Sequence, residues 1–307
     1  MRRPGWLRWG RRPSTLPRQV AADTLAMPGE AWPSREAFLR VRDGTGHERL
    51  KAQWQMGLQL PLACGEEGLS GLCVLCATRC RFGRPGEPAS FDVREGLACE
   101  GCGVNARMRH ALSLLLEGLD RSCARIYLTE QASPGFVWLA GHAACVEGSE
   151  FGLDDARRKR LQRWFEDLGG RGELQEADVT ALTRGDGSLD AIGCFDVLEH
   201  VPDYRAALRE FARVLAPGGR LVLTVPFRET AQHTLVRARR QDDGSIEHLE
   251  PEEIHGDPVS GGVLCFYHFG WDLLDALREA GFREAEWVRS FVPEYAVYGL
   301  WALRARR

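Results

Sequence analysis

Apolar positions recur at two different spacings along the second half of the chain, which predicts alternating helices and strands. Residues 108–119 carry apolar side chains at helical spacing, and a Ser133-Pro134 pair predicts the start of a helix. Amphipathic patterns predict further helices over residues 154–168, 204–215 and 271–280. Short apolar runs predict strands over residues 124–129, 143–146, 173–175, 189–195 and 220–225. Strands that alternate with helices form right-handed crossovers, so the pattern predicts a mostly parallel sheet with an α/β architecture.

The C-terminal end of the chain departs from this alternation. Residues 286–291 and 296–303 both have strand character, and no helical pattern separates them. We therefore expect an antiparallel pair at the end of the parallel sheet. Gly281 follows the predicted helix over 271–280, where a left-handed glycine would end it.

The N-terminal segment, residues 1–60, has weak periodicity and is rich in Arg, Trp and Pro. A short helix is predicted from Ser34, as N-cap, to Val41. We expect the rest of residues 1–60 to form a poorly structured extension.

Four of the ten cysteines form two Cys-x-x-Cys pairs, Cys73 with Cys76 and Cys99 with Cys102, and the segment 77–98 separates the pairs. Four thiolates at this spacing fit a tetrahedral structural Zn²⁺ ion, and Gly103 suits a tight turn beside it. Free thiols or a redox pair are the alternative. We expect residues 61–104 to be a zinc-ribbon-like module that needs the metal to fold, with Cys64 and Cys80 as spare ligands.

Overall charge and hydropathy narrow the possible partners. The formal net charge of −3 among 307 residues gives no global basic excess, which argues against a nucleic-acid partner. No apolar run is long enough to span a bilayer, and the Arg-rich N-terminus lacks the apolar stretch of a secretory signal. We expect a cytoplasmic protein, and the sequence leaves its oligomeric state open.

Three segments carry a family resemblance. The sequence DAIGCFDVLEHVPD occupies residues 190–203, REFARVLAPGGRLVLTVP follows at 209–226, and HFGWDLLDALREAGF ends at Phe282. In this order they resemble class I S-adenosylmethionine-dependent methyltransferases of the type 11-like group, which includes ubiquinone-biosynthesis-like and sugar-modifying enzymes. The resemblance implies a Rossmann-like, seven-stranded, mostly parallel sheet with helices on both faces, formed by residues 105–307.

The resemblance also implies how S-adenosylmethionine would bind. Glu150, with Glu147 as second choice, matches the acid that holds the ribose hydroxyls, and Asp178 matches the position that contacts the adenine amino group. Phe195 and Asp196 end the fourth strand of the family fold and would flank the methyl-transfer site.

The loop after the first strand departs from the family pattern. A Gly-x-Gly-x-Gly loop is usual there, but this chain reads IYLTEQASPG over residues 126–135. Glu130 could supply the acid that binds the methionine ammonium of the cofactor. Either this loop binds the cofactor in an altered way, or the chain is a non-catalytic, zinc-containing adaptor. A nicotinamide dehydrogenase is disfavoured because the Gly-x-Gly-x-x-Gly turn is absent.

The structure can distinguish these two readings. Convergence of Glu130, Glu150 and Asp178 on an open crevice would favour a cofactor site, whereas Arg or Trp side chains filling that crevice would favour the adaptor.

The acceptor side is expected in the insertion over residues 232–268, which would cover the acceptor site as a lid. His255 is the leading candidate for a base, although a hydrogen bond within a loop turn would explain it equally. His200 could be a base or could orient the helix that follows it. We expect a small molecule, a glycan or a nucleotide sugar as the acceptor, by resemblance alone.

Overall fold

The computed structural model describes residues 25–64, 68–83, 92–256 and 261–307. Asp257, Pro258 and the segment 1–24 lie outside this range. Within it, no helix combines the length and the apolar character needed to cross a membrane.

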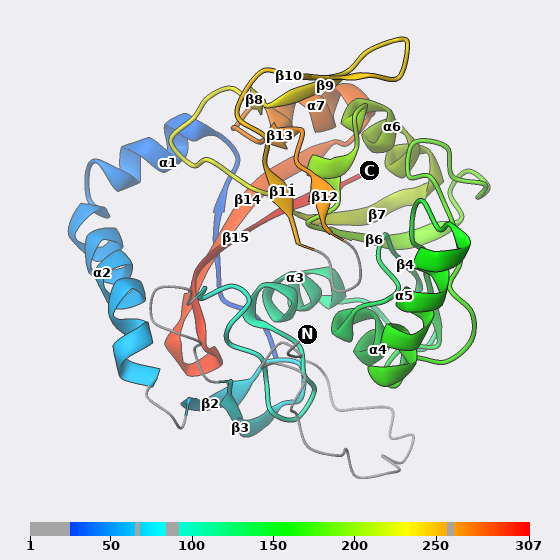
Figure 1. Ribbon diagram of the computed structural model, residues 1–307. Coiled ribbons are helices and arrows are strands. Elements are labelled where there is room, and N and C mark those ends of the chain that lie inside the picture. Colours follow the sequence, from blue (N-terminus) through cyan, green and yellow to red (C-terminus); the bar gives the residue numbers. More distant parts are fainter. Residues whose placement is uncertain (1–24, 65–67, 84–91, 257–260) are drawn as a thin grey trace.

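A seven-stranded sheet forms the centre of the molecule (Figure 1). Its order is β1-β14-β15-β7-β6-β4-β5. The strands are, in that order, Glu30–Trp32, Glu284–Val292, Val297–Arg306, Leu215–Thr224, Leu189–Phe195, Arg125–Leu128 and Cys145–Gly148. The neighbours among β5, β4, β6 and β7 pair in parallel, whereas β7–β15, β15–β14 and β14–β1 pair antiparallel. The sequence predicted the parallel strands and the antiparallel C-terminal pair correctly, but three of the six strand pairings are antiparallel, so the sheet is mixed and not mostly parallel.

Two of the predictions about strands and the N-terminus were wrong. Residues 173–175 do not form a strand, and only an isolated parallel bridge between Glu150 and Glu176 remains there. The seventh strand is instead β1, which comes from the segment predicted to be poorly structured. Leu174 in the run 173–175 is buried without joining the sheet, whereas Trp32 of β1 is buried opposite Trp287 and pairs with β14.

Helices cover both faces of the sheet. They are α3 (Ala106–Leu116), α4 (Pro134–Ala140), α5 (Asp155–Asp167), α6 (Tyr204–Val214) and α7 (Leu273–Ala280). The first three share one hydrophobic core and the last two share the other, and Figure 1 shows α3 and α4 on the opposite side of the sheet from α6 and α7. Each predicted cap is present, since Ser133 accepts a hydrogen bond at the start of α4 and Gly281, with φ 108°, ends α7.

The N-terminal part adds two helices to this frame, α1 (Arg35–Arg42) and α2 (His47–Cys64). Ser34 caps α1, as predicted. Phe38 of α1 is buried and its ring lies 5.7 Å from Trp271 and 5.3 Å from Trp301. These aromatic contacts explain why this segment is ordered although its periodicity is weak.

The Cys-rich segment contains a hairpin of β2 (Leu69–Cys73) and β3 (Thr78–Phe82). The insertion after β7 contains three two-stranded ribbons, in which β8 (Leu235–Val236) pairs with β13 (Tyr267–His268), β9 (Ala238–Arg240) with β10 (Ile246–His248), and β11 (Ile254–His255) with β12 (Val263–Leu264). Two 3₁₀ turns complete the elements, Leu198–His200 after β6 and Pro293–Tyr295 between β14 and β15.

Candidate functional site

Acidic residues follow three neighbouring parallel strands at the same edge of the sheet. Glu130, Glu150 and Asp196 come directly after β4, β5 and β6. Strand β4 has β5 on one side and β6 on the other, so the chain reverses its direction of winding at β4. The crevice at the carboxyl ends of strands at such a reversal is the usual ligand site of open α/β sheets.

Glu150 fixes the loop that follows β4. Its Oε1 accepts hydrogen bonds from the backbone N–H groups of Gln131 (2.9 Å) and Ala132 (2.7 Å). The loop then enters α4, whose Gly135 lies against α3 so closely that a Cβ there would be 2.5 Å from Cε of Met108. This glycine therefore serves the packing of two helices, and the acid after β5 sets the loop conformation.

Glu130 lies among charges of both signs. Its Oε1 is buried and has no hydrogen-bond partner among the described residues. Burial, together with the nearby carboxylates of Glu150 and Asp196, raises the pKa of Glu130 to about 8. The Arg107 guanidinium opposes this increase. Glu130 and Glu150 thus converge, as a cofactor site requires.

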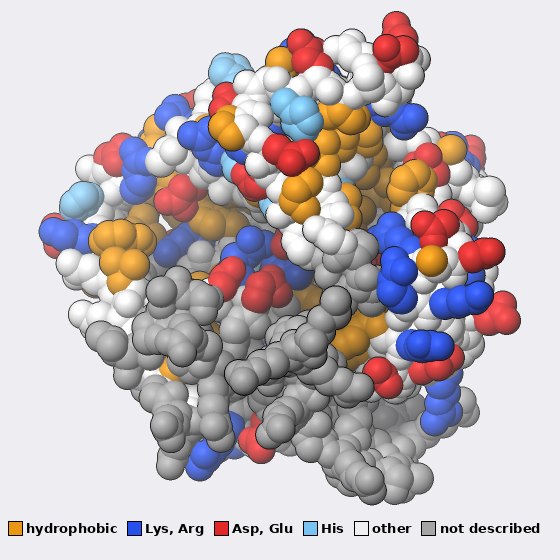
Figure 2. Space-filling view, viewed as in Figure 1, with side chains coloured by type: hydrophobic (Ala, Val, Ile, Leu, Met, Phe, Trp, Pro, Cys, Tyr) orange, Lys and Arg blue, Asp and Glu red, His pale blue; other side chains and the backbone are white. Residues whose placement is uncertain are grey.

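Asp196 is held by two arginines that the sequence did not point to. Its backbone is in the left-handed region, with φ 51°. One oxygen of its carboxylate lies 2.8 Å from Nη2 of Arg94 and 3.1 Å from Nε of Arg107, which is also 2.6 Å from Glu95. Against the effect of burial, these guanidinium groups hold the pKa of Asp196 below its usual range. In Figure 2, acidic and basic side chains lie together near the centre of this face.

The other residues predicted for the cofactor lie outside this convergence. Asp178 is exposed, and its Oδ1 accepts hydrogen bonds from the backbone and hydroxyl of Thr180. Phe195 is 1% exposed and packs in the core. Glu147 is paired with Arg184. The roles of Asp178 and Phe195 stay predictions.

A second cluster of titratable side chains joins the end of β6 to the insertion. Glu199 is fully buried, and its Oε1 lies 3.6 Å from Nδ1 of His255 and 3.8 Å from Nε2 of His200. Nε2 of His255 lies 2.9 Å from Glu253, whose Oε1 is also 2.8 Å from Nε2 of His268. The structure therefore brings together the two histidines that the sequence singled out, and places two carboxylates between and beside them.

These carboxylates set the charge of the cluster. The neighbouring Cys265 and Glu199 side chains raise the pKa of His255 to about 11. Burial raises the pKa of Glu199, whereas hydrogen bonds with His268 and His255 outweigh burial and lower the pKa of Glu253 to about 2. At this pKa His255 holds its proton at neutral pH. Its role as a base stays a prediction.

Comparison with known proteins agrees with this arrangement. Residues 119–223 match the model of a family described as a methyltransferase domain. The matched range contains the four parallel strands and the three helices α4, α5 and α6 that join them.

Individual relatives also match only part of the chain. Methyltransferase GfsG of Streptomyces halstedii is 34% identical over 112 residues, which are 36% of this chain and 40% of that protein. The ubiquinone biosynthesis O-methyltransferase of Xanthomonas oryzae pv. oryzae is 49% identical over 49 residues, 16% of this chain and 20% of that protein. The chain therefore spans less than half the length of these relatives. A crystal structure of an S-adenosylmethionine-dependent methyltransferase from Mesorhizobium loti aligns with 63% of this chain and 96% of its own, at 19% identity and a TM-score of 0.41.

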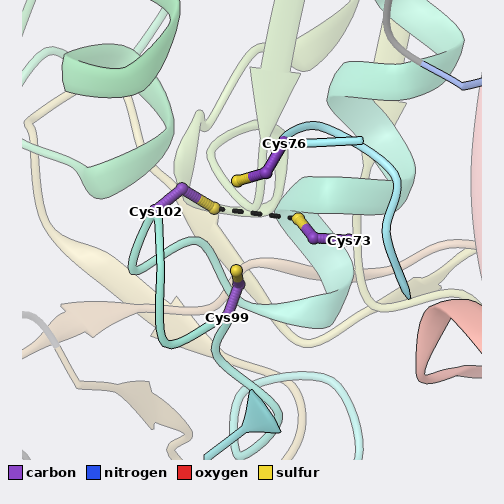
Figure 3. A group of neighbouring side chains, drawn as sticks. All are labelled: Cys73, Cys76, Cys99 and Cys102. Atoms are coloured by element: carbon purple, nitrogen blue, oxygen red, sulfur yellow. Dashed lines mark hydrogen bonds between the residues drawn. The ribbon is translucent and has the colours of Figure 1, made fainter. Parts of the chain in front are cut away.

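The predicted cysteines lie together in the segment that precedes α3 in the chain. Cys73, Cys76, Cys99 and Cys102 point toward a common centre (Figure 3), and their Sγ atoms all lie within 4.8 Å of one another. The Sγ atoms of Cys73 and Cys102 are 4.0 Å apart, close to the roughly 3.8 Å that a tetrahedral ion with about 2.3 Å bonds to sulfur imposes.

The two Cys-x-x-Cys turns have the same backbone form. In each, the residue after the second cysteine has a positive φ, 52° at Ala77 and 73° at Gly103. In each, the N–H of that residue donates to the carbonyl of the first cysteine, at 2.8 Å. Two matching turns that present their sulfur atoms to one point are the geometry of a closed four-thiolate site.

Arg109 connects this cysteine group to the turn between β14 and β15. Its buried guanidinium donates to the carbonyls of Leu97 and Val104 on one side and of Tyr295 and Ala296 on the other, and it lies 4.2 Å above the ring of Phe82. Burial lowers the pKa of Arg109, and the nearby cysteine sulfurs oppose this effect. Four thiolates around a divalent ion would carry net negative charge, and the buried guanidinium of Arg109 would compensate it.

Sequence reasoning missed Arg94, Arg107, Glu199 and Glu253. Both arginines come much earlier in the sequence than Asp196, and Arg94 lies in the segment assigned to the cysteine module. Of these four residues, only Glu199 could have been found from the sequence, because it precedes His200 in the family motif.

Proposed function

We propose that this chain is an S-adenosylmethionine-dependent methyltransferase that acts on a small-molecule or glycan acceptor. The observation that carries the proposal is the convergence of Glu130 and Glu150 at the point where the sheet reverses its winding. The methyltransferase-domain match covers the same strands.

The residues at this edge fit the charged parts of the cofactor. The buried Oε1 of Glu130 has no hydrogen-bond partner among the described residues, and an ammonium group would supply one. Arg94 and Arg107 present guanidinium groups, which suit a carboxylate. We propose that Glu130 binds the methionine ammonium and that the arginines bind its carboxylate, with Glu150 toward the ribose and Asp178 toward the adenine.

The chemistry needs little from the protein besides alignment. The bound cofactor supplies an electrophilic methyl group. The acceptor atom forms a bond to this methyl group while the carbon–sulfur bond breaks, and a hydroxyl acceptor also loses its proton. We propose that Phe195 and Asp196 flank the transfer site and that the acceptor lies against His200 and His255, under the ribbon of β11 and β12.

The cysteine group is proposed to hold a structural Zn²⁺ ion. Its four sulfur ligands would fill the tetrahedral shell and leave no position for a substrate. The ion would then stabilise the fold, and the reaction would take place at the edge of the sheet.

The ion pairs of Asp196 favour a second candidate, a non-catalytic adaptor with a methyltransferase-like fold. Arg94 and Arg107 bring into the crevice the arginine side chains that the adaptor reading expects. In the methyltransferase, Arg94 and Arg107 would leave Asp196 when they bind the cofactor. In the adaptor, they would stay paired with Asp196.

Hydrogen–deuterium exchange with and without S-adenosylhomocysteine tests the location of the site. The proposal predicts slower exchange in the segments that follow β4, β5 and β6, around Gln131, Phe151 and Val197. Slower exchange confined to other segments would contradict the assigned site, and unchanged exchange at saturating ligand would favour the adaptor.

A further inference from the structure

We propose that Glu199, His200 and His255 bind a divalent transition-metal ion of the zinc class, separate from the ion of the four cysteines. The three side chains come from the 3₁₀ turn after β6 and from β11. Each offers one ligand atom, and these atoms all lie within 4.8 Å of one another. The role of this ion in catalysis rests on the proposed function, but its binding does not.

The distances suit a tetrahedral ion after small adjustments. Oε1 of Glu199 lies 3.6 Å from Nδ1 of His255 and 3.8 Å from Nε2 of His200. Zinc bonds of about 2.0–2.1 Å to nitrogen and oxygen place tetrahedral ligands about 3.3 Å apart. Side-chain movements of a few tenths of an ångström would bring these two pairs of atoms to that distance, and the two imidazole nitrogens lie within 4.8 Å of each other.

The buried carboxylate of Glu199 is a second, independent observation that points to a cation-binding site at this trio. The residue is 0% exposed, and neither of its oxygens makes a hydrogen bond within the described part of the chain. A buried carboxylate without hydrogen bonds is costly, and coordination to a cation satisfies both its charge and its lone pairs.

Hydrogen bonds outside the trio orient both imidazoles toward Glu199. Nδ1 of His200 lies 2.8 Å from the carbonyl of Leu264, which leaves Nε2 with the lone pair on the side of Glu199. Nε2 of His255 lies 2.9 Å from Oε1 of Glu253, which leaves Nδ1 for an ion. A metal-binding histidine usually donates its second N–H to a carboxylate or a backbone carbonyl, and both forms are present here.

The surrounding groups support the arrangement from the insertion side. The N–H of Phe266 donates to the carbonyl of Glu199 at 2.8 Å and fixes the turn that carries it. Glu253 is held in turn by His268 and by Arg237, at 2.8 and 3.1 Å. The ligand from β11 is therefore positioned by a network and does not depend on its own short ribbon.

Two imidazoles and one carboxylate leave a fourth position open, unlike the closed cysteine site. This donor set is that of catalytic zinc sites, in which the open position takes water or substrate. An acceptor hydroxyl bound there would lose its proton to solvent more readily and would then attack the methyl group, and the cofactor would leave as S-adenosylhomocysteine. The site thus favours an oxygen acceptor with a deprotonation step.

The test counts metal ions in the full chain, without any cofactor. The protein is dialysed to equilibrium against micromolar Zn²⁺, and zinc per chain is measured by elemental analysis. We expect two equivalents in the wild type and one in both Glu199→Gln and His255→Ala. His248→Ala, in the exposed ribbon of β10, is the matched control and should keep two. A single equivalent in the wild type, or a second one that persists in both variants, overturns the proposal.

Cobalt substitution of the wild type gives a measurement that does not depend on the folding of a variant. Co²⁺ at the four cysteines shows sulfur-to-metal charge transfer, whereas Co²⁺ at Glu199, His200 and His255 adds ligand-field bands without it. A second Co²⁺ equivalent with only sulfur charge transfer would contradict this site. Because S-adenosylmethionine is absent from both experiments, failure here is distinguishable from failure of the methyltransferase assignment.

Discussion

Glu130 is the residue whose charge state is most closely tied to cofactor binding. Without a ligand its raised pKa, about 8, keeps it protonated at neutral pH. A bound ammonium group would lower this pKa, so binding at pH 7 would release a proton. We predict that the affinity for S-adenosylmethionine rises between pH 6 and pH 8. Calorimetry in buffers of different ionisation enthalpy measures the released proton directly.

The isosteric variant Glu130→Gln provides the control for this prediction. It should bind more weakly and release no proton. The same residue also affects stability, because the folded state holds a proton that the unfolded chain has lost above about pH 4.5. Its contribution to stability is full below that pH and is lost as the pH rises toward 8. Proton release that is equal in the wild type and in Glu130→Gln would assign the proton to another group.

At the scale of elements, the loop after β4 lacks the usual glycines, and Gly135 at the start of α4 serves the contact with α3. We predict that Gly135→Ala lowers the free energy of unfolding by about 1–3 kcal/mol, because its Cβ would lie 2.5 Å from Met108 and would push α4 away from α3. Urea unfolding measures this loss. Gly57→Ala, in α2, meets nothing within 4 Å and should cause no loss. An equally stable Gly135→Ala variant would show that the helix contact is loose.

The same scale shows what the sequence could predict. Periodicity located β6, α6 and α7 almost to the residue, because α6 and α7 each bury one apolar face and β6 is an almost continuous buried run. It failed for β1, which depends on the pairing of Trp32 with β14, a strand near the opposite end of the chain. His200 was found in the family motif and His255 in the long insertion, but Arg94 and Arg107 meet Asp196 only through tertiary folding, for which a single sequence carries no local signal.

At the scale of the whole molecule, the cysteine module and the central sheet share one hydrophobic core. Cys73, Phe82 and Leu97 pack in the same cluster as Leu112 of α3 and Leu128 of β4. Removal of zinc should therefore lower the melting temperature of the entire domain and not only unfold a separate module. Thermal unfolding followed by circular dichroism, before and after chelation, checks this prediction.

A matched pair of cysteine variants separates metal loss from other effects of the chelator. Cys99→Ser should reproduce the decrease in melting temperature, and Cys123→Ser, at an exposed position, should leave it unchanged. An unchanged melting temperature in Cys99→Ser would mean that the four cysteines do not hold a structural metal.

Binding of the cofactor is the most direct test of the central claim. Calorimetric titration of the zinc-loaded protein with S-adenosylmethionine and S-adenosylhomocysteine should show a single site with micromolar affinity, equivalent to about −8 kcal/mol. Glu150→Ala, which removes the acid that fixes the loop after β4, should abolish this binding, and Glu147→Ala, on the neighbouring exposed acid, should preserve it. Absence of binding at millimolar ligand would contradict the methyltransferase assignment and would favour the adaptor.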